Sequence, residues 1–137
     1  MPVLLRCAAV RGTVALSMTS PPKQVLLVDD NEDARELLGG LLEIQGYQVE
    51  VAADASGALE IAARWKPQII VLDLGLPEVD GWELARQLRQ IEGLAGVRIV
   101  ALTGYGSERD RERSREAGID QHLLKPIEIS QLVRAFA

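Results

Sequence analysis

Short, uninterrupted runs of apolar residues recur along the chain and predict buried β-strands. Residues 25–28 (Val-Leu-Leu-Val) and 69–72 (Ile-Ile-Val-Leu) contain no polar side chain, and each run stops abruptly at an aspartate. A strand covered on both faces has this pattern, whereas a half-exposed strand alternates apolar and polar positions. Residues 47–52, 99–102 and 123–124 predict three further strands. The pattern therefore predicts five short strands, of which the first and third are fully buried.

The segments between these strands space their apolar residues three or four positions apart, which is typical of amphipathic helices. We expect one helix that ends at Gly46, a second over residues 55–64, a third from the turn at residues 79–81 through Gln90, and a last short one over residues 129–136. The Gly39-Gly40 pair is expected to weaken the first helix locally. The residues expected to face the core are Ala34, Leu37, Leu38, Leu41 and Leu42 in the first helix, Ala58, Leu59, Ala62 and Ala63 in the second, and Leu84, Ala85 and Leu88 in the third.

Residues 107–117 differ from the other helical segments because they are dominated by charge. The segment carries eight charged side chains and almost no apolar stripe, and Gly118 follows it. A helix without an apolar stripe has little surface to bury against a core. We therefore expect a helix here that is only lightly packed.

Five strands alternating with five helices, joined by connections of a few residues, predict an α/β fold with a parallel sheet covered on both faces. Right-handed crossovers leave few ways to wind such a sheet. A chain of 137 residues has room for one such domain. We assign residues 23–137 to it and treat residues 1–22 as a flexible N-terminal extension or as a misassigned start, with translation beginning at Met18.

The charge of the chain is unevenly distributed. The net charge is −5, but residues 1–22 contain Arg6 and Arg11 and no acid, so the remainder carries 13 basic against 20 acidic residues. An acidic body without a basic cluster argues against direct nucleic-acid binding and suits a protein that concentrates divalent cations. No apolar stretch is long enough to predict membrane insertion, and the single cysteine, Cys7, points weakly to the cytoplasm.

Functional side chains follow the predicted strands at their carboxyl ends. Asp29 and Asp30 follow the first strand, Asp73 the third, Thr103 the fourth and Lys125 the fifth. In an open α/β sheet, ligands bind beyond the carboxyl ends of the strands, where the winding reverses. Each residue alone is explained as a strand terminus or a helix cap. Together they predict a site at one edge of the sheet.

These residues lie in motifs that resemble the response-regulator receiver family. The motifs are Val-Asp-Asp-Asn at 28–31, Leu-Asp-Leu-Gly-Leu-Pro at 72–77 with Asp-Gly at 80–81, Ala-Leu-Thr-Gly at 101–104 and Leu-Lys-Pro at 124–126. They match the family in kind, order and spacing over residues 23–137, and residues 101–106 are particularly similar to receivers of hybrid sensor kinases. The resemblance implies a flavodoxin-like fold with strand order 2-1-3-4-5.

The resemblance also implies roles for the residues of the predicted site. Asp73 would be the phosphoacceptor, and Mg²⁺ would bind Asp30, Asp73 and the backbone carbonyl of Gly75 directly, with Asp29 acting through water. Lys125 would pair with one phosphoryl oxygen and the Thr103 hydroxyl would bond another. The small residue Gly104 would let the phosphoryl group enter.

A receiver of this kind is a switch rather than an enzyme, although it assists its own phosphorylation and dephosphorylation. The implied partners are a bacterial histidine kinase or histidine phosphotransfer protein, a downstream protein target and, on phosphorylation, a possible second copy. Thr103 would move the face formed by the fourth helix and the fifth strand. The family places an aromatic switch residue three positions before the lysine, where this chain has His122.

Other functions fit the sequence less well. A phosphohydrolase of the haloacid-dehalogenase type requires an acid two residues after Asp73, where this chain has Gly75. A flavodoxin requires a phosphate-binding loop after the first strand, where residues 29–33 are strongly acidic. The lone His122 has no cysteine or histidine partner nearby for a transition-metal site. The remaining alternative is a receiver-fold interaction module that works without phosphorylation.

Overall fold

The computed structural model describes residues 23–76, 80–104 and 108–136, with the backbone alone for residues 108 and 109. The predicted N-terminal extension, the end of the motif at 72–77, the start of the predicted turn at 79–81, the end of the stretch at 101–106 and Ser107 at the start of the charged helix lie outside these ranges. Strands and helices alternate along the described chain as β2 (Gln24–Val28), α1 (Glu32–Ile44), β3 (Gln48–Ala52), α2 (Ala55–Trp65), β4 (Ile69–Asp73), α3 (Gly81–Arg89), β5 (Arg98–Thr103), α4 (Glu108–Glu116), β6 (Gln121–Leu124) and α5 (Ile129–Ala135).

The five strands form one parallel sheet in the order β3-β2-β4-β5-β6. Counted along the chain, this is the order 2-1-3-4-5, so the predicted fold class is confirmed. The winding reverses between β2 and β4, where Val28 lies beside Leu72. The polar residues that follow these two strands therefore come out next to each other.

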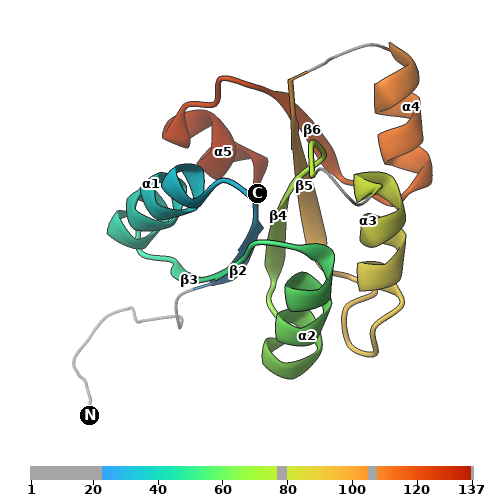
Figure 1. The fold of residues 1–137 in the computed structure, drawn as a ribbon, viewed down its shortest axis with the longest axis horizontal. Helices are drawn as coiled ribbons and strands as arrows, with labels where there is room; N and C mark the ends of the chain where they lie inside the picture. Colours follow the sequence, from blue (N-terminus) through green and yellow to red (C-terminus); the bar gives the residue numbers. More distant parts are fainter. Residues whose placement is uncertain (1–22, 77–79, 105–107, 137) are drawn as a thin grey trace, which may run out of the picture.

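Helices cover both faces of the sheet, with α1 and α5 on one side and α2, α3 and α4 on the other (Figure 1). Alternate residues of the central strands enter two separate cores. Leu26, Val28, Ile70 and Leu72 pack with the α2 and α3 side chains, while Val25, Leu27, Ile69 and Val71 pack with those of α1 and α5. The uninterrupted apolar runs at residues 25–28 and 69–72 follow from this double burial. Among the described residues, no helix has the length and apolar character needed to cross a membrane.

Two residues predicted to face the core are exposed instead. Leu37 of α1 is 64% exposed, and Ala63 of α2 is also exposed. The predicted stripe on α1 was too wide, because Leu37 and Leu42 lie about 140° apart around a helix of 3.6 residues per turn. Leu42 and Gly39 face the sheet, and a Cβ on Gly39 would lie 3.8 Å from Val49 of β3.

The charged helix α4 is lightly packed, as its sequence predicts. Among its described side chains only Ser114 is buried, and Ala117 just beyond its end adds one more buried group. Gly118 then takes a positive φ of 86° and ends the helical segment. The structure places β6 two residues earlier than the apolar pair at 123–124 suggests, because Gln121 and His122 also pair with β5.

Gly81, the first residue of α3, has no room for a side chain. A Cβ there would lie 2.7 Å from Leu74 Cδ2 and 3.1 Å from Leu74 Cα, and the backbone atom cannot rotate away. We expect Gly81→Ala to lower the free energy of unfolding by about 1–3 kcal/mol, as overpacking does. Gly40→Ala is the matched control, because its Cβ would meet nothing within 4 Å. It should raise stability by up to about 1 kcal/mol. Urea denaturation measures both changes, and a Gly81→Ala protein as stable as wild type would contradict the close contact.

Candidate functional site

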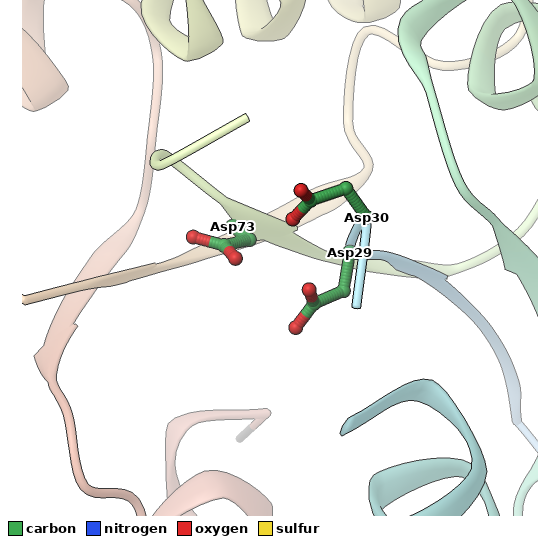
Figure 2. A group of neighbouring side chains, drawn as sticks. All are labelled: Asp29, Asp30 and Asp73. Atoms are coloured by element: carbon green, nitrogen blue, oxygen red, sulfur yellow. The ribbon is translucent and has the colours of Figure 1, made fainter. Parts of the chain in front are cut away.

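The carboxyl ends of β2 and β4 bring three aspartates together at one edge of the sheet. Asp29 and Asp30 directly follow β2, and Asp73 is the last residue of β4. Figure 2 shows the side chains of these residues grouped around one space. One carboxylate oxygen from each lies within 4.8 Å of the others. Asp29 and Asp73 are only 2% and 4% exposed, while Asp30 is open to solvent.

Backbone groups fix the two buried carboxylates. The Asn31 N–H donates to Asp29 Oδ1 at 2.9 Å, and the Gly75 N–H donates to Asp73 Oδ1 at 2.8 Å. In each case the aspartate side chain accepts from the backbone N–H two residues later in the chain. The turn that follows the strand therefore also orients the carboxylate at the strand end. Asn31 caps α1 through its own side chain, which accepts from the Ala34 N–H at 2.9 Å.

The other strand ends add a cation and a hydroxyl. Lys125 Nζ lies 3.0 Å from Asp73 Oδ2 in an ion pair. The Lys125 N–H donates to the Thr103 carbonyl at 2.8 Å, so the ends of β5 and β6 are joined beside the carboxylates. Thr103 is buried. A Cβ on Gly104 would meet no described atom within 4 Å, so the described fold itself does not require glycine there.

The close carboxylates perturb the protonation of Asp29. Burial raises the pKa of Asp29 above its ordinary value of 3.8, and the nearby charge and hydrogen bonding of Asp73 raise it further. The Asn31 N–H bond and the Lys125 charge act in the opposite direction on this pKa. Loss of water around the carboxyl and repulsion by Asp73 both disfavour the charged form of Asp29. The oxygen-only donor set of the cluster suits a hard divalent cation such as Mg²⁺.

His122 lies on β6 beside Ala101 of β5 and is half-buried. Both ring nitrogens are buried, and neither has a hydrogen-bond partner in the described part of the chain. Burial lowers the pKa of His122 below 6.5, and the Arg111 charge lowers it further, whereas Asp110 raises it. The imidazole in this environment is therefore neutral at neutral pH.

We expect His122→Phe to flatten the dependence of stability on pH. The folded protein holds its imidazole neutral, so below pH 6.5 the unfolded chain binds more protons and wild-type stability falls as the pH falls. The variant has no such group. The free energy of unfolding of the variant minus that of the wild type should therefore increase between pH 7.5 and pH 5.5. Urea denaturation at both pH values tests this, and equal losses in the two proteins would contradict the buried neutral imidazole.

Sequence reasoning gave no role to a cluster that joins α3 to α4. The Trp82 indole N–H donates to Ser114 Oγ at 3.1 Å, and the Arg113 guanidinium stacks 3.9 Å from the Trp82 ring centroid. Arg113 also pairs with Asp80 at 3.3 Å. The only signal in the sequence was a tryptophan next to the Asp-Gly turn, with nothing to indicate its partner.

Comparison with known proteins identifies the family to which the chain belongs. Residues 25–137 match the response regulator receiver domain. The polar-differentiation response regulator DivK of Brucella anthropi is 32% identical over 82% of this chain and 91% of DivK.

Two solved structures are also similar. The receiver domain of a Pseudomonas aeruginosa sensor histidine kinase, with a magnesium ion coordinated in its active-site cleft, aligns with a TM-score of 0.76 at 33% identity over 84% of this chain and 94% of that one. A Burkholderia pseudomallei response regulator with a phosphorylated aspartic acid aligns with a TM-score of 0.79 at 32% identity, over 84% of this chain and 66% of that one. The chain belongs to the response-regulator receiver family of two-component systems.

Proposed function

We propose that this receiver is a Mg²⁺-dependent phosphoacceptor, that Asp73 takes the phosphoryl group, and that a histidine kinase or histidine phosphotransfer protein supplies it. The observation that carries the proposal is the meeting of Asp29, Asp30 and Asp73 with Lys125 at the carboxyl edge of the sheet. The phosphorylated aspartic acid of the similar Burkholderia pseudomallei regulator supports it.

The residues present fit a magnesium ion. We propose that Asp30, Asp73 and the backbone carbonyl of Gly75 bind it directly and that Asp29 binds through water. When bound, Mg²⁺ would offset the carboxylate charge and the charge of an incoming phosphoryl group. The raised pKa of Asp29 supports this assignment, because a buried carboxylate beside another one is better accommodated next to a cation.

Asp73 is oriented for attack on phosphorus. Gly75 holds one of its oxygens through a backbone N–H, and Lys125 neutralises the other. A carboxylate oxygen of Asp73 forms the new bond to phosphorus while the bond to the donor imidazole nitrogen breaks, and that nitrogen keeps the electron pair. Positioning and charge stabilisation dominate such a transfer, so Lys125 would follow the phosphoryl oxygen rather than remain on the carboxylate.

Output in this proposal starts at Thr103. Its hydroxyl would bond a phosphoryl oxygen, and the end of β5 would carry the change towards α4 and β6, where His122 occupies the switch position. The recipient is a downstream protein that binds this face, and the domain that carries the switch spans residues 23–137. Signalling of this kind takes place in the cytoplasm, where the donor domain also lies.

Intact-mass spectrometry of the full chain, incubated with acetyl phosphate with and without Mg²⁺, tests the proposal. We expect a single phosphoryl adduct that forms with Mg²⁺ and is absent when EDTA is added. The adduct should be lost on treatment with hydroxylamine, because an acyl phosphate is labile to this nucleophile. If no adduct forms and the phosphoryl mimic beryllofluoride also does not bind, the protein is an interaction module that works without phosphorylation.

A further inference from the structure

Four residues link the first turn of α3 to the last part of α4, and we call them the α3–α4 latch: Asp80, Trp82, Arg113 and Ser114. One carboxylate oxygen of Asp80 caps α3 by accepting from the Trp82 N–H at 2.9 Å, and the other pairs with Arg113. The same Arg113 stacks on the Trp82 ring, whose indole N–H bonds Ser114. Ser114 is 2% exposed, so the latch includes a buried hydrogen bond as well as a surface ion pair.

The latch matters because little of the described part of α4 is buried. Among the described side chains of α4, only Ser114 is buried, and most of the remainder are exposed charges. A helix with so little buried apolar surface is at the low end of local stability. Its position therefore depends strongly on the contacts made by Arg113 and Ser114.

The α3 end of the latch is connected to the phosphoacceptor Asp73 through Gly81 and Leu74. Trp82 follows Gly81, and Gly81 lies so close to Leu74 that a Cβ would come within 3.1 Å of its Cα. Leu74 directly follows Asp73 and is tied to β5 through its N–H, which donates to the Leu102 carbonyl at 2.9 Å. Leu74 therefore packs against the first residue of α3 and bonds to β5, so a displacement of the chain after Asp73 would be passed through Leu74 to the latch.

We propose that the α3–α4 latch holds α4 in the arrangement seen here and opens when the Asp73 site is loaded, so that Trp82 and Arg113 are positioning residues that set how readily the site is loaded. The inference rests on the proposed function. It gives α4 a second connection to Asp73, through the β4–α3 side, in addition to the connection through Thr103. The Trp82 indole contacts both the Arg113 guanidinium and the Ser114 hydroxyl, so its fluorescence emission reports whether the latch is closed.

The coupling between the latch and the loading of the Asp73 site has a defined sign. A contact made in the unloaded arrangement and lost in the loaded one opposes loading, and its removal strengthens loading by the same factor. An exposed cation–π contact with an accompanying ion pair corresponds to about a threefold to tenfold change in affinity. We therefore expect Arg113→Gln to bind beryllofluoride and Mg²⁺ about three to ten times more tightly than wild type. A residue that only stabilises the fold would leave the affinity unchanged or weaken it.

The experiment uses the full chain with Trp65→Phe, so that Trp82 is the only tryptophan. Beryllofluoride is titrated in the presence of Mg²⁺, with binding followed by ¹⁹F NMR and the latch followed by Trp82 emission. We expect the emission of the Trp65→Phe protein to change on loading, and we expect unloaded Arg113→Gln to show part of that change already. Arg113→Lys, which keeps a cation over the ring, should restore most of the wild-type affinity. Arg86→Gln is the matched control on the exposed face of α3 and should leave both readouts unchanged.

Two results would overturn the inference. One is beryllofluoride binding without any change in Trp82 emission, which would show that the latch stays closed. The other is an Arg113→Gln affinity equal to or weaker than that of wild type. If ¹⁹F NMR shows no binding to the wild-type chain, the phosphoacceptor function fails first, and the coupling fails with it.

Discussion

Asp73→Asn is expected to abolish phosphorylation by acetyl phosphate, with the rate falling by at least about 1000-fold, as the loss of a nucleophile does. The amide keeps an oxygen that accepts from the Gly75 N–H and a side chain of the same size, so the fold around β4 should be retained. It lacks the charge and the nucleophilic oxygen, and it cannot form the ion pair with Lys125. Intact-mass spectrometry of the treated variant measures the result.

The control for this variant is Asp54→Asn. Asp54 also follows a strand and begins a helix, but its side chain caps α2 by accepting from the Gly57 N–H, and it lies outside the carboxylate cluster. Asparagine preserves such a cap, so stability should change little. The Asp54→Asn protein should be phosphorylated at the wild-type rate. An adduct on Asp73→Asn that forms as fast as on wild type would move the phosphoacceptor to another residue.

Asp29→Asn is expected to weaken Mg²⁺ binding while stabilising the metal-free protein. Replacement of a residue that holds a metal through a water molecule lowers the metal affinity by about 10–100-fold. The same change removes a buried charge that lies beside Asp73, and relief of such a site commonly raises the free energy of unfolding by about 0.5–2 kcal/mol. Isothermal titration calorimetry with Mg²⁺ and urea denaturation in EDTA measure the two effects.

The stabilisation by Asp29→Asn should depend on pH in a defined direction. The folded pKa of Asp29 is raised above 3.8, so above that folded pKa the charged carboxylate costs stability. As the pH falls through the folded pKa, Asp29 takes up a proton and the cost disappears. The advantage of the variant should therefore be full at pH 7 and shrink on acidification.

Asp33→Asn, an exposed acid in the first turn of α1, is the matched control for these measurements. It should change neither the Mg²⁺ affinity nor the pH dependence of stability appreciably. An Asp29→Asn protein that is less stable than wild type in EDTA at pH 7 would contradict the inference that burial and repulsion by Asp73 destabilise the charged Asp29 carboxylate.

The sheet could be predicted from the sequence because its central strands are buried on both faces. Such burial leaves no place for a polar side chain, so residues 25–28 and 69–72 stand out without any knowledge of their partners. The strand ends were equally clear, since Asp29 and Asp73 interrupt these runs abruptly. The convergence of these residues follows from the parallel topology, which brings all carboxyl ends to one edge.

The helices show where a pattern of spacing alone is insufficient. Leu37 fits the apolar stripe of α1 in sequence, yet the helix approaches the sheet along Gly39 and Leu42, and Leu37 is left exposed. Which part of a wide stripe is buried depends on the docking angle, and that angle is set by neighbouring elements rather than by the helix itself.

The environments of His122 and Trp82 could not be predicted for a related reason. The α4 residues Arg111 and Asp110 act on the buried His122 ring through their charges, and the partners of Trp82 come from that same helix. Helix α4 has almost no apolar stripe, so its sequence does not specify where it docks. Contacts between elements of this kind appear only after both elements are placed.

Identification of the phosphorylated residue tests the central claim most directly. The wild-type chain is treated with acetyl phosphate and Mg²⁺ and then with borohydride, which reduces an aspartyl phosphate to homoserine, and its peptides are sequenced by mass spectrometry. We expect homoserine at position 73 alone, and no conversion in the presence of EDTA. Homoserine at position 29 or 30, or an unaltered Asp73 in a chain that carries the adduct, would contradict the account.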